Sequence, residues 1–303
     1  MKNKMSIMQF GSYPQSEVKD SALISVLNNT AGQLPTRLNH AKWTDYGYYV
    51  SSEIASYMWY IDLVIDNHAY RGVYSKSYRP SANSFRSYSV TKTSSHPDCY
   101  QKDHGYTIDH VYWFKYEPIT WRVLDVQSGK AFIMASLVLD SQNFHSSTTK
   151  RTINGITVNA NNYKESYIRA WLNHDFYNVA FNSLEKDRIK TTFVDNSPVS
   201  TGNTMNPHEC ADTYDKVFLL SYAEFMSNTY RLKANTPNCF LASDYAKSQG
   251  VYPSSSGYSW WWLRSPDSSY NDYARVVLNA DVIDSSDVDR TYYGVVPALW
   301  ISL

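Results

Sequence analysis

The stretch WWWLRSPDSSYNDYARVV, residues 260–277, decides how the C-terminal part of the chain is expected to fold. Trp260, Trp261 and Trp262 lead into Leu263 and Arg-Ser-Pro, and a buried Trp removes up to about 250 Å² of surface from water. The next seven residues are only Asp, Ser, Tyr and Asn, with no apolar period, and ARVV then has the composition of a strand. The pattern predicts a buried strand, an exposed loop and a second strand.

The segment after the tryptophans has an unusual composition. Residues 267–293 contain no Lys, Glu, Gln, Met or Trp, although these five types account for 46 of the 303 residues. They are also the types that cannot arise when an Asn codon ending in a pyrimidine is randomised at its two adenines. The apolar stretch GVVPALWISL, residues 294–303, follows directly. We interpret residues 267–293 as a varied segment between fixed apolar flanks; the alternative is an ordinary solvated loop.

The rest of the chain predicts short strands at both ends with helices between them. FGSYPQ, residues 10–15, reads as a strand that ends in a turn at Pro14. Residues 117–125 and 131–136 read as a strand pair joined by a turn at 126–129. In residues 166–189 the apolar spacings predict two short helices joined near Asn173 and His174.

Two more segments carry a clear pattern. Residues 215–225 read as a buried strand that runs into a helix, and residues 243–249 read as a short helix. Residues 73–113 have no clear period and read as a loop insertion. No linker, repeat or break in composition divides the chain. We therefore expect one α+β domain spanning residues 1–303, with a C-terminal variable region at about 260–303.

Charge and hydropathy exclude several classes of partner. The formal net charge is zero, with 28 basic and 28 acidic residues, so nothing favours nucleic acid or an anionic membrane. No apolar run approaches the length of a bilayer-spanning helix, and the N-terminus is not a signal peptide as written. The protein is therefore expected to be cytoplasmic, unless a leader has been removed.

Several groups of reactive side chains are candidates for catalytic or metal sites. Residues 96–110 contain three His, three Asp and a Cys, but their spacing matches no compact zinc pattern, and a polar loop is favoured. His208-Glu209-Cys210 places a thiol beside a possible base, without a third partner indicated by any motif. The carboxylates of Asp140, Asp175 and Glu185 are scattered along the chain. We expect no catalytic residues.

A calcium-dependent sugar site is also not supported by the sequence. Glu117-Pro118 is followed by Ile119 where the calcium-lectin pattern has Asn, and no Trp-Asn-Asp follows. The three cysteines, Cys99, Cys210 and Cys239, are too few and too widely spaced for a disulfide framework. We expect no metal and no cofactor.

FGSYPQ, EPITWRVLD, IRAWLNHDFYNVAF, DKVFLLSYAEF and, above all, WWLRSP…ARVV…GVVPALWISL resemble the variable proteins of diversity-generating retroelements. The resemblance covers nearly the whole chain and is weakest over residues 30–113. It implies a C-type lectin fold of the formylglycine-generating-enzyme kind. It also implies that adenine-directed mutagenic homing rewrites codons near the 3′ end of the gene, and that the altered residues form a ligand-binding surface.

The resemblance has further implications and two departures. Such proteins are often bacterial surface lipoproteins, which would place this chain at the cell surface through a removed leader. Its ligand would be specific to the variant, a protein or glycan on another cell. Relatives usually have Asp-Gly in the turn after the ARVV strand, whereas this chain has Asn279-Ala280-Asp281. The redox cysteine pair of the enzymatic relatives is not recognisable, which favours a non-enzymatic role.

These observations define the predicted site. We expect the variable side chains to lie on one exposed face, with Tyr270, Tyr273, Tyr292 and Tyr293 as its main binding residues. The full predicted set is Ser268, Ser269, Tyr270, Asn271, Asp272, Tyr273, Asn279, Asp281, Asp284, Ser285, Ser286, Asp287, Asp289, Arg290, Tyr292 and Tyr293. The predicted scaffold residues are Trp260, Trp261, Trp262 and Trp300. The alternatives are a fixed lectin-like adhesin and, less favoured, an enzyme on the same fold.

Overall fold

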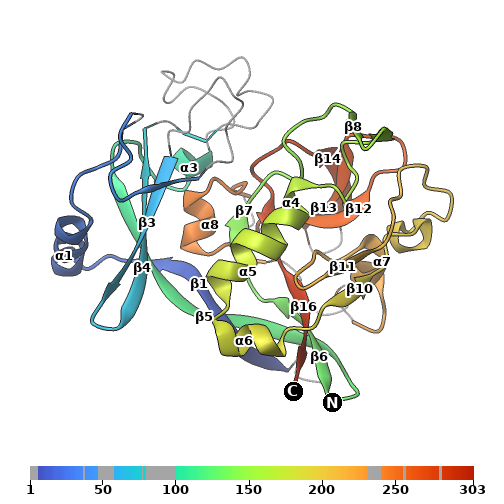
Figure 1. Ribbon diagram of the computed structural model, residues 1–303, viewed down its shortest axis with the longest axis horizontal. Coiled ribbons are helices and arrows are strands. Elements are labelled where there is room, and N and C mark those ends of the chain that lie inside the picture. The colour runs from blue at the N-terminus through green and yellow to red at the C-terminus, as the bar shows by residue number, and fades with distance from the viewer. Residues whose placement is uncertain are drawn as a thin grey trace.

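The structure is a computed structural model. It describes residues 6–36, 38–46, 58–76, 78–79, 100–230, 232, 240–254, 257–279 and 282–303, without the side chains of Asn279 and Val282. The architecture is mixed α+β and rich in sheet, with 20% helix and 38% strand. The expected α+β class is therefore confirmed, with short helices packed around two main sheets (Figure 1).

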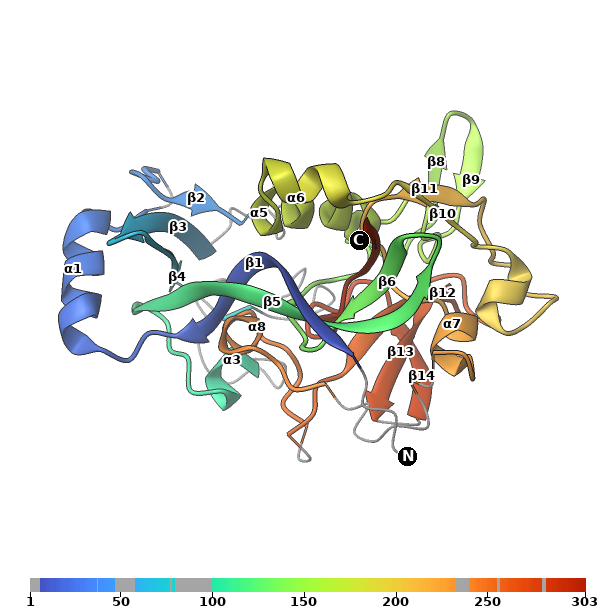
Figure 2. The same cartoon turned by 90° about the horizontal axis from the view of Figure 1, so that it is seen from below.

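The larger sheet contains strands from both ends of the chain. Its order is β16-β6-β5-β4-β3-β2, with β1 paired to β5, and all of its pairs are antiparallel. β5 pairs with β1, β4 and β6, so it connects the two halves of the sheet (Figure 2). The strands are β1 (Ile7–Glu17), β2 (Thr44–Asp45), β3 (Met58–Ile65), β4 (His68–Ser75), β5 (Val111–Gln127), β6 (Lys130–Ala135) and β16 (Ala298–Ser302).

The smaller sheet carries the C-terminal segment. Its order is β14-β13-β12-β15-β7, and β12 is buried at every one of its six positions. β13 and β14 form an antiparallel hairpin at the edge of this sheet, which Figure 2 shows side by side. The strands are β7 (Asp140–Ser141), β12 (Trp261–Pro266), β13 (Tyr273–Asn279), β14 (Val282–Asp287) and β15 (Gly294–Val295).

Short helices and two small ribbons complete the described part of the chain. The ribbons pair β8 (Arg151–Ile153) with β9 (Ile156–Val158), and β10 (Thr192–Val194) with β11 (Thr213–Asp215). The α-helices are α1 (Ser21–Ala31), α3 (Tyr100–Asp103), α4 (Tyr167–Trp171), α5 (Tyr177–Ala180), α6 (Ser183–Arg188), α7 (Tyr222–Met226) and α8 (Asp244–Ser248). A π-helical turn η1 (Leu172–Phe176) and a 3₁₀ turn η2 (Pro198–Thr201) are also present.

Two details of the predicted elements are wrong. Pro14 does not end the first strand but lies within β1, opposite Tyr116 and next to a break in register, where a missing N–H is tolerated. The helical segment is not divided at Asn173 and His174, because η1 carries it on to α5. The division comes at Asn182, whose side chain caps α6 in a capping box with Glu185.

The loop insertion predicted for residues 73–113 is partly regular structure. β4 continues to Ser75, α3 begins at Tyr100, and β5 begins at Val111. Residues 80–99, and with them His96 and Cys99, lie outside the described residues. The helix predicted within 243–249 is confirmed as α8, and the turn at 126–129 is confirmed between β5 and β6.

The apolar core has a main cluster and a smaller one. The main cluster includes Trp121, Trp171, Trp261 and Trp262 and lies between the two sheets and the helices of the second half. The smaller cluster gathers Trp59 and Trp113 with α1 and the outer strands β3 and β4. In the part of the chain that the structure describes, no helix is long and apolar enough to cross a bilayer.

Candidate functional site

The predicted variable residues occupy three connected segments. They are the loop 267–272 between β12 and β13, the β13–β14 hairpin, and the stretch 288–293 that leads into β15. Hydrogen bonds join these segments, since the Val288 amide donates to Asp272 O at 2.9 Å. Asp281 and the side chain of Asn279 lie outside the described residues.

A buried asparagine from another part of the chain holds the loop 267–272. The Nδ2 group of Asn161 donates to the carbonyl oxygens of Tyr270 at 2.8 Å and Tyr273 at 2.9 Å. The backbone amide of Asn161 donates to Asn271 O at 3.1 Å, and the Asn161 side chain is fully buried. All three contacts use backbone atoms of the loop, so they do not depend on which side chains the loop carries.

Asp267 fixes the start of the same loop. Its Oδ1 accepts the backbone amides of Ser269 at 2.7 Å and Tyr270 at 3.1 Å, and its own amide donates to Tyr273 O. Its Oδ2 lies 3.4 Å from the guanidinium of Arg275. Asp267 is 5% exposed, so it acts as a structural residue at the border of the varied segment. The Pro-Asp-Ser-Ser sequence is typical of such an Asx turn, a signal that the composition argument did not use.

One group of predicted residues forms a continuous patch in which Tyr270 is exposed and Tyr273, Asp287 and Arg290 are partly exposed. The ring of Tyr270, 58% exposed, lies 4.9 Å from the ring of Tyr273. Tyr273 is directly opposite Asp287 in the hairpin, and the negative charge of Asp287 raises the pKa of Tyr273. Asp287 in turn forms an ion pair of 2.9 Å with Arg290. This Tyr270–Arg290 patch offers aromatic, acidic and basic groups together.

The remaining small and polar residues surround this patch to different degrees. Strand register places Ser285 on the same face of the hairpin as Tyr273 and Asp287. Ser269 and Asp284 are exposed, and the partly exposed residues are Ser268, Asn271, Asp272 and Ser285. Asp284 points to the opposite face of the hairpin from Ser285, because side chains alternate along a strand.

Three predicted surface residues are buried, so the prediction of one shared exposed face is wrong for them. Ser286 is 9% exposed because it faces Ala274, which points into the core. Tyr293 is 5% exposed, its ring lies 4.5 Å from that of Trp262, and burial raises its pKa. Asp289 is 3% exposed. Asp289 follows Val288, whose carbonyl oxygen accepts a hydrogen bond from the His145 amide at 2.9 Å.

Tyr292 belongs to an aromatic cluster at the border of the candidate surface. Its ring lies 5.2 Å from Tyr100 and 4.8 Å from Tyr293. Tyr100 also contacts Tyr252, which stacks on Trp260 at 3.7 Å. Tyr100 and Tyr252 were not expected at this site, and neither lies in a pattern that would have indicated it.

Two of the four tryptophans predicted to form the scaffold are fully buried. Trp261 and Trp262 are 1% and 0% exposed, and Trp262 Nε1 donates to Gln142 O at 2.8 Å. Trp260 and Trp300 are only partly buried. Trp260 precedes β12 and stacks on the outer aromatic cluster, while Trp300 stacks on Phe132 at 5.1 Å.

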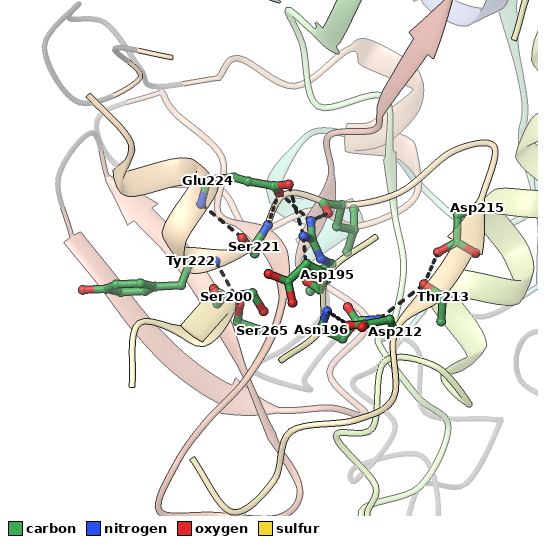
Figure 3. A network of polar contacts seen from close by, with 12 residues as sticks. Asp195, Asn196, Ser200, Asp212, Thr213, Asp215, Ser221, Tyr222, Glu224 and Ser265 are labelled. Carbon is green, nitrogen blue, oxygen red and sulfur yellow. Dashed lines mark hydrogen bonds and ion pairs between the residues drawn. The ribbon is translucent and has the colours of Figure 1, made fainter. Parts of the chain in front are cut away.

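A partly buried ion pair between Arg264 and Glu224 supports β12. Arg264, with a side chain 2% exposed, contacts the Glu224 carboxylate at 2.5 Å and donates to Leu219 O and Asp195 O. Burial acts to lower the pKa of Arg264, but the negative charge of Glu224 outweighs it and raises the pKa. Glu224 also accepts the Ser221 amide at the start of α7 (Figure 3). Both terminal nitrogens of the Arg264 guanidinium therefore have hydrogen-bond partners.

A hydroxyl and amide network extends this support. Ser265, the next residue of β12, accepts the Tyr222 amide at 2.8 Å (Figure 3). Further along, the backbone amide of Asn196 donates to Asp212, and the hydroxyl of Thr213 donates to Asp215 at 2.7 Å. The side chains of Arg264 and Ser265 in β12 are thus held by groups that lie outside residues 267–293.

The side chains considered as reactive groups in the sequence have the following surroundings in the described part of the chain. Cys210 is 5% exposed, and burial raises the pKa of its thiol, which disfavours the thiolate. Burial lowers the pKa of His208, against the attraction of Asp267. Among the described residues, no group of three His, Cys, Asp or Glu side chains could hold a metal ion. Asp140 accepts the Tyr13 hydroxyl at 2.6 Å, and Glu185 caps α6.

His145 forms a hydrogen bond with the stretch 288–293 of the candidate surface. Its backbone amide holds Val288, and its Nδ1 is buried without a hydrogen-bond partner among the described residues. Burial, together with the charge of Arg151, lowers the pKa of His145 to about 4. The imidazole is therefore neutral at ordinary pH.

Comparison with known proteins gives one match. No curated protein and no solved structure matches the chain. Residues 128–303, more than half of the chain, match a family described only as a domain of unknown function. The matched region begins in the β5–β6 turn and includes every segment of the candidate surface. The chain therefore belongs to the DUF6273 family.

Proposed function

We propose that this protein is a non-enzymatic ligand-binding protein whose C-terminal residues are diversified by mutagenic homing. One structural observation carries the proposal. Asn161 and the Asp267 side chain hold the backbone of the loop, so the loop keeps its path whatever side chains residues 268–272 display. A diversified site needs such independence, because each new variant must still fold.

The composition of the same segment supports the proposal. The five residue types missing from 267–293 are those that adenine-directed changes in Asn codons cannot produce. Exposed substitutions usually change stability by less than about 0.5 kcal/mol, so Ser268 to Asp272 can vary at little cost. Tyr, Ser and Asn are also the residues that form adaptable binding surfaces.

The burial of Ser286, Asp289 and Tyr293 narrows the proposed surface. We assign ligand contact to the Tyr270–Arg290 patch and its neighbours Ser268, Ser269, Asn271, Asp272 and Ser285. Tyr270 is the most exposed aromatic ring of this set and is the first candidate for a main binding residue. The ligand would be a protein or glycan on another cell.

The proposal also includes a specific fold and a cellular location for the protein. Short strands, peripheral helices and long connections are compatible with a C-type lectin fold of the formylglycine-generating-enzyme kind. We place the protein at the bacterial cell surface.

Sequencing the gene in a growing population tests the proposal. We expect a nearby template copy of codons 267–293, a reverse transcriptase gene, and changes confined to positions that are adenine in the template. A fixed lectin-like adhesin would show none of these. If variants arise equally at all bases, or equally in codons 128–259, the diversification proposal is refuted.

A protein-level experiment tests the surface itself. Replacing Ser268, Ser269, Tyr270, Asn271 and Asp272 together with other residues of the permitted set should leave the melting temperature almost unchanged. The matched control randomises five buried positions of β12. Unfolding of most loop variants would show that the side chains of this loop are structural.

A further inference from the structure

A pocket of about 370 Å³ lies outside the candidate surface. It is lined by the β5–β6 turn, by the stretch from Lys190 into β10, and by Trp300 of β16. Figure 1 shows β6, β10 and the end of β16 well away from the β13–β14 hairpin. None of the lining residues lies in 267–293, so the pocket is independent of the proposed function.

The charges that line this pocket are of one sign. Lys130 and Lys190 line it, and no carboxylate does so among the described residues. The backbone of β16 lies between them, because Lys190 N donates to Trp300 O at 2.8 Å and Lys130 pairs with Ser302. Neither ammonium group lies within ion-pair distance of a carboxylate in the described ranges. The pocket therefore favours an anionic ligand.

Two aromatic side chains provide apolar surface beside these charges. Trp300 is stacked on Phe132 at 5.1 Å with an interplanar angle of 11°, which covers one face of its ring and fixes its orientation. Phe193 is 54% exposed, and the Tyr214 ring lies 5.7 Å from it. A large exposed apolar side chain within a pocket is a feature of ligand-binding sites.

Hydroxyl groups complete the lining. Ser128 and Thr191 lie at the pocket with the two lysines. A hydroxyl both donates and accepts hydrogen bonds, so it suits a ligand that itself carries hydroxyls. The pocket thus combines two cations, an oriented aromatic ring and neutral polar groups.

We propose that this pocket binds an acidic sugar. The apolar C–H face of the sugar ring would lie on Trp300, its carboxylate would lie between Lys130 and Lys190, and its hydroxyls would contact Ser128 and Thr191. A nucleotide is the less favoured ligand. Among the described residues, the lining of the pocket includes no glycine-rich loop and no helix N-terminus to receive phosphates, and no arginine for bidentate contact.

Titration with methyl β-glucuronide tests the proposal, with methyl β-glucoside as the neutral ligand of the same shape. Binding is followed by calorimetry and by the indole N–H signal of Trp300, assigned through Trp300→Phe. We expect a saturable interaction with a dissociation constant near about 1 mM. The glucoside should bind at least about tenfold more weakly, and added salt should weaken only the glucuronide.

The lysines are tested with Lys130→Gln/Lys190→Gln, and Lys42→Gln/Lys164→Gln is the matched control of equal charge change. Each exposed ion pair changes affinity by up to about fivefold, so the pocket variant should lose affinity by up to about 25-fold while the control binds normally. Both variants are checked for unchanged melting temperature.

Several results would overturn the assignment. They are equal binding of glucuronide and glucoside, no saturable binding by the parent protein, and an unchanged affinity of the lysine variant. Tighter binding of adenosine monophosphate than of glucuronide at the Trp300 signal would identify a nucleotide site instead. Since variants in 267–293 leave this pocket intact, failure here and failure of the proposed function are separable.

Discussion

Asn161 donates its side-chain amide to the carbonyl oxygen of Tyr270 at 2.8 Å, although the two residues are 109 positions apart in the sequence. The contact is between a buried side chain and a backbone atom. It fixes where Tyr270 lies but not what residue 270 must be.

The first prediction concerns Asn161. Asn161→Ala removes two hydrogen bonds and leaves the carbonyl oxygen of Tyr270 without this donor, while that of Tyr273 keeps the Asp267 amide, so the variant should lower the free energy of unfolding by about 1–3 kcal/mol. Urea denaturation measures the change. Ser269→Ala, an exposed substitution in the same loop, is the control and should stay within about 0.5 kcal/mol. Equal midpoints for the two variants would show that Asn161 does not support the loop.

The second prediction separates the tryptophans. Trp262→Ala should lower the free energy of unfolding by about 3–5 kcal/mol, as large truncations in a core do. Trp300→Ala should cost clearly less, because Trp300 is only partly buried. Chemical denaturation of the two variants gives the comparison. A larger loss for Trp300 than for Trp262 would contradict the assignment of the frame.

The third prediction contrasts two tyrosines that the sequence treats alike. Tyr293→Ala should lower the free energy of unfolding by about 3 kcal/mol or more, because it empties a packed aromatic site against Trp262. Tyr270→Ala should stay within about 0.5 kcal/mol, since its ring is largely exposed. Thermal unfolding measures both. If Tyr293→Ala left the free energy of unfolding unchanged, Tyr293 would be an exposed residue of the candidate surface and not part of the core.

The fourth prediction concerns pH. The pKa of His145 is lowered to about 4 in the folded protein, whereas an unfolded histidine titrates near about 6.5. Between these values the unfolded chain binds more protons, so the free energy of unfolding falls as the pH falls from about 6.5 to 4, by up to about 3 kcal/mol. Above pH 6.5 this contribution is fully present.

Denaturation at a series of pH values checks this effect. His145→Gln should flatten the profile in that window, and His174→Gln, at an exposed histidine, serves as the control. If His145→Gln keeps the slope of the parent protein, another group is responsible.

Some parts of the fold could be predicted because the information is local. Trp261 and Trp262 were expected to be buried, since several large apolar residues in succession have no stable place outside a core. The β5–β6 turn was predicted because Ser128-Gly129 lies between two apolar runs, and both residues have positive φ. The helix α8 was predicted from its short apolar pattern after Ser243, which caps it.

Other parts depend on contacts that no local pattern encodes. Asn161 is an isolated polar residue in sequence, and its role exists only because β12 and β13 bring residues 270–273 to it. Tyr292 and Tyr293 are adjacent and identical, and only the path into β15 decides which ring is buried. The composition of 267–293 could indicate which residues vary but not which of them face solvent.

The pairing of β5 has a consequence for dividing the protein into fragments. The family match begins at residue 128, inside the turn between β5 and β6, so β5 and β1 fall outside it. A fragment of residues 128–303 would leave one edge of β6 without its neighbour, and an unpaired edge is a template for strand addition by another chain. Such a fragment should self-associate, and an independently soluble piece must retain the preceding strands that complete the sheet.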